Sequence, residues 1–155
     1  MILEILLTKI KLFIDFNCFM KKIYSKKKPK ILLHIVTNVD EIVSGRIAIA
    51  PEEEYLQLAI LKMQKGMTFK PHKHIKHKKM TDIAQESWFV FQGKVKCIFY
   101  DIDDTIIDQP IIGKGGISMT FRGGHNYEIL EDKTIVLEYK TGPYLGQEFD
   151  KTFIK

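Results

Sequence analysis

From Ile31 onward, apolar and polar residues alternate in short runs that end at glycine, proline or aspartate, which is typical of half-buried β-strands. Almost no helical periodicity follows residue 45. The residues between successive runs are turn formers, and Gln92-Gly93 predicts a hairpin. The pattern predicts strands over residues 31–36, 46–50, 56–63, 88–92, 94–102, 105–112, 117–121 and 134–140, with one more beginning at residues 123–124.

So many short strands without intervening helices predict an all-β fold, either an antiparallel sandwich or a small barrel. A double-sheet jelly roll is the favoured arrangement. The 155 residues suit one domain, and no internal repeat is visible. We expect the β-barrel to occupy residues 31–155 and an N-terminal extension with a basic linker to occupy residues 1–30.

The N-terminal segment 1–19 is rich in isoleucine, leucine and phenylalanine, but four charged residues interrupt it. No uncharged run approaches the roughly 20 residues that span a bilayer, and no cleavage site of a signal peptide is present. Three interpretations remain open: an amphipathic helix covering the domain, an interfacial membrane helix, or an extension upstream of a start at Met20. The lysines within residues 21–30 predict a solvated linker.

The two cysteines, Cys18 and Cys97, form no spaced framework. A reducing cytoplasm is therefore the expected location, with Cys97 as a small core residue.

The net charge of +5 raises the question of a nucleic-acid partner. The positive charge comes from 22 lysines and only two arginines, Arg46 and Arg122. Because arginine supplies most bidentate contacts to bases and phosphates, this composition argues against a nucleic-acid partner. The lysines within residues 70–79 instead suggest attraction of an anionic small molecule, and an AT-rich codon bias is the alternative explanation of the lysine content.

Four residues have the chemistry of a metal site. His72 and His74 are two positions apart, so on an extended strand their imidazoles point to one face. Glu86 offers a carboxylate at the start of a later strand, and His125 offers a third imidazole. Three histidines and one carboxylate bind a divalent transition metal and leave positions for water or substrate. The alternative is a set of surface residues without a common ligand.

Around these residues the sequence resembles the cupin superfamily. Its first motif is a glycine, five residues, His-x-His, a gap, a glutamate, six residues and a glycine. The matching positions are Gly66, His72, His74, Glu86 and Gly93. The gap before Glu86 holds eleven residues, which is longer than usual, and residues 120–122 replace the Pro-x-Gly of the second motif.

The resemblance implies a jelly-roll barrel whose mouth holds Fe, Mn, Zn or Ni. The metal ligands that it implies are His72, His74, Glu86 and His125. Glu86 is the candidate catalytic residue. Lys140 and Tyr144, beside the Gly142-Pro143 turn, are candidates for binding an anionic or sugar-like substrate, the alternative being a simple tail turn. His34 is expected to be a core or surface histidine, and His77 to be solvated.

Three functions follow as hypotheses. The first is a small metal-dependent enzyme, such as an isomerase, epimerase, lyase or dioxygenase, acting on a carbohydrate-like or organic-acid molecule. The second is a non-catalytic module that binds or senses a small molecule. The third is a metal-free sugar-nucleotide epimerase or ketoisomerase, against which the intact ligand set argues. We expect no stable membrane insertion, and open sheet edges favour a homodimer.

Overall fold

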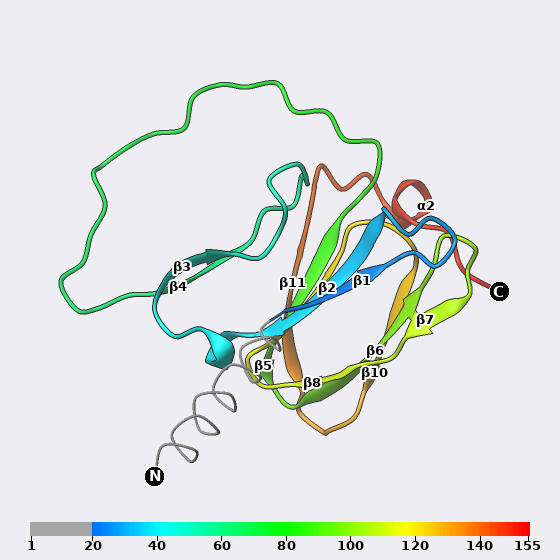
Figure 1. Ribbon diagram of the computed structural model, residues 1–155. Helices are drawn as coiled ribbons and strands as arrows, with labels where there is room; N and C mark the ends of the chain where they lie inside the picture. Colours follow the sequence, from blue (N-terminus) through cyan, green and yellow to red (C-terminus); the bar gives the residue numbers. More distant parts are fainter. Residues whose placement is uncertain (1–19) are drawn as a thin grey trace, which may run out of the picture.

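The computed structural model describes residues 20–155, which form antiparallel β-sheets with two short helical turns (Figure 1). The prediction of an all-β fold is therefore confirmed. The strands are β1 (Met20–Tyr24), β2 (Leu32–Asn38), β3 (Gly45–Ala48), β4 (Ala59–Lys62), β5 (Glu86–Gln92), β6 (Lys94–Tyr100), β7 (Ile106–Asp108), β8 (Ile111–Gly113), β9 (Gly116–Thr120), β10 (His125–Ile129) and β11 (Ile135–Lys140). The helical turns are η2 (Val39–Glu41) and α2 (Gln147–Asp150).

Three sheets are formed by these strands. The largest has the order β1-β2-β9-β5-β11, the second has the order β10-β6-β7 with β8 also paired to β6, and β3 and β4 form a separate hairpin. Figure 1 shows the two larger sheets facing each other, with the hairpin lying apart from the second sheet.

The space between the two larger sheets holds one of two hydrophobic clusters. Val90 of β5 and Val95, Cys97 and Phe99 of β6 are all fully buried there. Burial raises the pKa of the Cys97 thiol to about 12, so this cysteine is an unreactive core residue, as its strand pattern predicts.

The second cluster lies on the opposite face of the five-stranded sheet. Ile35, Ile117 and Met119 of β2 and β9 pack there against the β3–β4 hairpin and the segment that follows β3. Strands β2 and β9 are thus covered on both faces, which explains why all five residues of β9 are buried. A strand buried on both faces loses the strict alternation of apolar and polar residues that a strand with one solvent-exposed face shows.

The structure corrects the predicted pairing around Gln92-Gly93. Strands β5 and β6 follow each other directly, but β5 belongs to the five-stranded sheet and β6 to the second sheet, so they form no hairpin. Gly93, at φ +87°, turns the chain from one sheet into the other, and a side chain here would collide with Thr134.

Two further boundaries differ from the prediction. The basic segment 21–30 begins with β1, in which Ile23 is buried between the sheets and pairs with His34. The single strand predicted over residues 105–112 is two short strands, β7 and β8. The three interpretations of residues 1–19 concern a segment that lies outside the described residues.

The jelly-roll arrangement goes beyond what the sheets establish, because no sheet formed by residues 20–155 is closed on itself. In the same part of the chain, no helix has the length and apolar character needed to cross a membrane.

Candidate functional site

Glu86 and His125, two of the predicted metal ligands, lie against each other. Glu86 is the first residue of β5 and His125 is the first residue of β10, so each stands at the end of a strand in a different sheet. His125 Nε2 is 3.1 Å from Glu86 Oε1. The packing of the two sheets therefore unites a carboxylate and an imidazole that are 39 residues apart in the sequence.

A glycine turn sets the position of His125. Gly123 has φ +75°, and a Cβ at this position would collide with the carbonyl oxygen of Tyr100. The backbone N–H of Tyr100 donates to the carbonyl oxygen of Gly124 at 2.8 Å, which ties the turn to β6. Glycine is required here because other residues rarely adopt this backbone conformation.

Glu86 belongs to a row of polar residues that crosses the inner face of the five-stranded sheet. In the strand register His34 is opposite Thr120, Thr120 is opposite Glu86, and Glu86 is opposite Lys140. We call these four residues the polar row. It brings one titratable or hydroxyl side chain from each of β2, β9, β5 and β11 to the same level of the sheet.

His34 forms the buried end of the polar row. Its Nε2 is 3.2 Å from the carbonyl oxygen of Tyr100 and its Nδ1 is 3.0 Å from Thr120 Oγ1. Since a carbonyl only accepts, Nε2 carries the proton and Nδ1 accepts from the threonine hydroxyl. Burial lowers the pKa of His34 to about 4, against the smaller raising effect of its hydrogen bond to Tyr100. This neutral, stacked histidine (ring centroid 4.3 Å from that of Phe99) is the core residue that the sequence left open as core or surface.

Glu86 is held in its ionised form. Burial alone would raise its pKa, but hydrogen bonding from His125, the charge of His125 and the Trp88 indole N–H outweigh burial and lower the pKa. Trp88 Nε1 donates to Glu86 Oε1 at 2.9 Å. A carboxylate kept charged in a largely buried position is suited to binding a cation or accepting a proton.

An aromatic pair supports the two site residues from within. The Trp88 and Tyr127 rings stack with centroids 3.9 Å apart and an interplanar angle of 14°. The Tyr127 hydroxyl pairs with Ser118 Oγ at 3.0 Å. Nothing in the sequence marked Tyr127 or Ser118, because their roles depend on how the sheets face each other.

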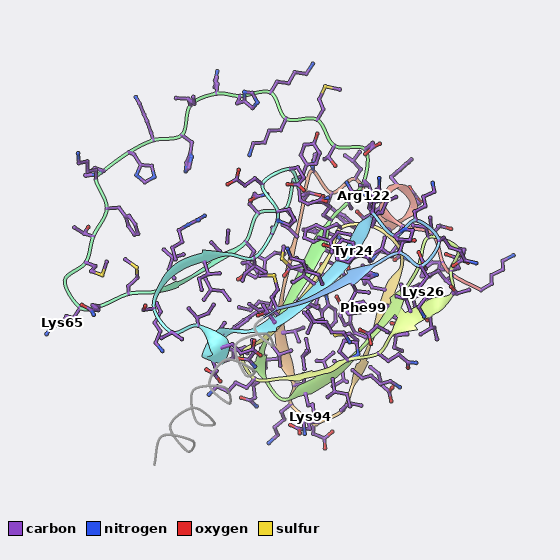
Figure 2. The ribbon with its side chains drawn as sticks, in the orientation of Figure 1. Tyr24, Lys26, Lys65, Lys94, Phe99 and Arg122 are labelled. Carbon is purple, nitrogen blue, oxygen red and sulfur yellow. The ribbon has the colours of Figure 1, made fainter. Side chains whose placement is uncertain are left out.

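The structure does not bring His72 and His74 to this pair. Both lie in the loop between β4 and β5, in which residues 63–84 are exposed and form no strand. This loop extends away from the sheets in Figure 1, and Figure 2 shows Lys65 at its far end. The two imidazole rings are neighbours, with centroids 5.6 Å apart.

Residues 20–155 contain no cluster of three or more histidine, cysteine, aspartate or glutamate side chains that would hold a metal ion. The pair Glu86–His125 and the pair His72–His74 nevertheless each have donor atoms that suit a metal ion. Two ligand atoms that are each about 2.1 Å from one ion lie roughly 3 Å apart, which matches the distance between Glu86 Oε1 and His125 Nε2. His72 Nδ1 lies 2.9 Å from the carbonyl oxygen of Lys70, an arrangement that leaves Nε2 available to an ion.

The two predicted substrate-binding residues lie together at the end of β11. Lys140 Nζ is 4.2 Å from the centre of the Tyr144 ring and 3.2 Å from Asp150 Oδ2 of α2. Burial would lower the pKa of Lys140, but the hydrogen bond and charge of Asp150 outweigh it and raise the pKa. Because Lys140 is opposite Glu86 in the register, this rim adjoins the candidate site.

Sequence reasoning also missed a buried carboxylate behind the site. Glu54 Oε1 is 2.6 Å from Arg122 Nη1, and its Oε2 accepts from Gln85 Nε2 at 2.6 Å. Gln85 also joins the backbone to this cluster, because its side-chain oxygen accepts from the Leu56 N–H at 2.8 Å.

Comparison of the chain with family models, with curated proteins and with solved structures gives no match.

Proposed function

We propose that this chain is a metal-binding cupin that acts as a small metal-dependent enzyme on a carbohydrate-like or organic-acid molecule. The direct approach of Glu86 and His125 carries this proposal. The cupin resemblance implies both residues as metal ligands, and their side chains meet at ligand spacing from strands of different sheets.

In this proposal the metal ligands are Glu86 and His125 together with His72 and His74 of the loop. The loop ends directly at Glu86, and the eleven residues after His74 reach about 35 to 40 Å when extended, so its length permits both histidines to come to the site. The exposed loop has few buried contacts to hold it in place, which makes such a movement inexpensive.

A divalent ion bound there would polarise a substrate oxygen or activate a bound ligand. Side chains of the protein carry out the proton transfer and orient the substrate. Glu86, being ionised, accepts a proton from the substrate and returns it at a neighbouring position, as an isomerase, epimerase or lyase requires. Lys140 and Tyr144 orient an anionic or hydroxyl-rich substrate at the rim, where the positive charge of Lys140 is maintained.

Metal analysis of the purified full-length chain tests this proposal. We expect one equivalent of metal in the wild type, or after reconstitution with Fe, Mn, Zn or Ni, and loss of it in His72→Ala and His125→Ala. His77→Ala is the matched control, because His77 lies in the same exposed loop and should leave the metal content unchanged. A wild type that takes up none of the four metals would contradict the proposal. If metal is bound, screens of oxygen uptake and sugar turnover would separate an enzyme from a sensor.

A second candidate function is a metal-free sugar-nucleotide epimerase or ketoisomerase, or a binding module that uses the same residues. The observation that favours it is the hydrogen bond between Glu86 and His125, since a carboxylate that orients an imidazole forms an acid–base pair without a metal. A wild type that lacks metal but binds nucleotide-sugars, with binding lost in Glu86→Gln, would select this function.

A further inference from the structure

One apolar surface is left uncovered on the outer face of the five-stranded sheet. The β3–β4 hairpin covers this face over β2 and β9, but the last two strands of the sheet, β5 and β11, leave large side chains in solvent. We call this surface the β11 patch: it consists of Phe91 (56% exposed), Ile135 (46%), Leu137 (42%) and Tyr139 (54%). Several large apolar side chains at about half exposure on adjacent strands are typical of an interaction surface.

The patch borders an open sheet edge. Strand β11 is the last strand of its sheet, and no strand formed by residues 20–155 pairs with its outer side. The Thr141 N–H donates to the Gln85 carbonyl at 3.0 Å, on the side of β5. Because backbone groups alternate sides along an antiparallel strand, those of Val136, Glu138 and Lys140 point to the open edge.

The two edges of this sheet differ in how well they are protected. Strand β1, at the other edge, carries Lys21 and Lys22 in its five residues, and lysine on an edge strand discourages pairing with another chain. Strand β11 contains no proline, and its one lysine is its last residue, Lys140, whose ammonium group is 3.2 Å from Asp150 Oδ2. The register shift near Ile135 places the extra residue in β5, so β11 itself remains a regular strand. Of the two edges, that of β11 is therefore the one available for pairing.

The sequence of β11 favours pairing with a second copy of itself. An antiparallel pair with its two-fold axis at Glu138 would place two carboxylates directly opposite each other, which is unfavourable. With the axis at Leu137, the two copies of Leu137 are opposite each other, Ile135 is opposite Tyr139, and Glu138 is opposite Val136. This register places no like charges opposite each other and gathers all outward apolar residues of β11 into one continuous stripe.

We propose that the chain forms a two-fold homodimer in which the β11 strands of two copies pair antiparallel about Leu137 and join the two five-stranded sheets. The backbone groups of Val136 and Glu138 then bond to those of Glu138 and Val136 of the second copy. The stripes made by Ile135, Leu137 and Tyr139 of the two copies then lie side by side on the outer face of the joined sheets, where cross-strand contacts shield part of their exposed apolar surface from water.

Light scattering coupled to size exclusion tests the assembly on the full-length chain. We expect the wild type to have twice the chain mass at tens of micromolar, and Leu137→Lys and Tyr139→Lys each to shift it to the monomer with an unchanged far-ultraviolet circular dichroism spectrum. Tyr24→Lys is the matched control, because Tyr24 is 44% exposed on β1 at the opposite edge, and it should remain dimeric (Figure 2).

Cysteine cross-linking tests the register. In a Cys18→Ser background, Leu137→Cys should form a disulfide-linked dimer on mild oxidation, since residues directly opposite in a pair without backbone hydrogen bonds approach closely enough for a disulfide. Tyr139→Cys should cross-link at least tenfold more slowly. A monomeric wild type, a dimer that survives both lysine variants, or faster cross-linking at residue 139 than at residue 137 would overturn the proposal.

Discussion

Glu54 and Arg122 form an ion pair of 2.6 Å in which the Glu54 side chain is 6% exposed and the Arg122 side chain is 41% exposed. The second carboxylate oxygen accepts from the Gln85 amide. Gln85 directly precedes Glu86, and Arg122 is three residues before His125, so one carboxylate links the two segments that carry the candidate site.

We expect Glu54→Ala to lower the free energy of unfolding by about 3 kcal/mol, because it leaves the buried Gln85 amide and the Arg122 charge without their acceptor. Urea unfolding at pH 7 measures this loss. Glu53→Ala is the matched control, since the neighbouring glutamate is exposed, and it should change stability by no more than about 0.5 kcal/mol. Equal effects of the two substitutions would show that the pair contributes nothing to stability.

The alternation of apolar and polar residues located most strands but did not determine which strands pair with one another. A period of two tells which residues share a face, and the strand predicted over residues 134–140 corresponds to β11, Ile135–Lys140. It does not tell whether consecutive strands pair, so the step from β5 to β6 was predicted as a hairpin although Gly93 carries the chain between sheets. The strand β1 was missed because its lysines outnumber the one buried residue, Ile23.

The candidate site was predictable only in part, because the sequence pattern does not determine which strands pair. Glu86 keeps the spacing of the first motif and His125 matches only the histidine of the second, and the packing of the sheets places the two side chains in contact. His34 and Thr120 belong to the same polar row but have no local signal, because their alignment arises from strand register. The loop with His72 and His74 lacks apolar alternation, so nothing local to it determines where the imidazoles lie.

The pH dependence of stability should report the neutral state of His34. Its pKa is about 4 in the folded chain and about 6.5 when unfolded, so the unfolded chain binds the proton first as the pH falls. The folded state is therefore destabilised progressively between pH 6.5 and 4, by roughly 2 to 3 kcal/mol at pH 4.5.

Urea unfolding of the wild type and of His34→Gln, each at pH 7 and pH 4.5, measures this loss of stability. The variant should be less stable at pH 7, because it loses the stacking on Phe99, but it should lose about 2 to 3 kcal/mol less than the wild type between the two pH values. Parallel losses in both chains would mean that His34 binds a proton while folded.

Trp88 should act as an internal reporter of the candidate site. It is the single tryptophan of the chain, and its indole N–H donates to the same Glu86 oxygen that His125 contacts. Binding of Mn²⁺, Ni²⁺ or Zn²⁺ at Glu86 draws charge from that oxygen and weakens the indole hydrogen bond, so the emission of Trp88 should change and saturate with metal.

A fluorescence titration of metal-free chain gives the measurement. The change should be lost in His125→Ala and retained in His77→Ala, whose side chain lies in the exposed loop. Metal uptake with no response of Trp88 would place the ion away from Glu86 and contradict the proposed ligand set.

Lys140 should hold the C-terminal segment against β11. Its ammonium group contacts Asp150 and the Tyr144 ring, and both ends of the ion pair are largely shielded, with 21% and 14% of the side chains exposed. The pKa of Lys140 is raised in the folded chain, so its stabilising effect is fully present below the unfolded value of about 10.5 and is lost as the pH rises through the folded value.

We therefore expect Lys140→Met, which keeps most of the apolar stem, to speed hydrogen exchange of residues 144–151 about two- to fivefold at pH 7, in line with a partly exposed ion pair. High salt should reduce the difference between variant and wild type, because it screens the same pair. Lys114→Met, on an exposed residue between β8 and β9, is the control and should leave the exchange of this segment unchanged. If both variants exchange at the wild-type rate, α2 is held by its other contacts and the ion pair does not anchor the rim.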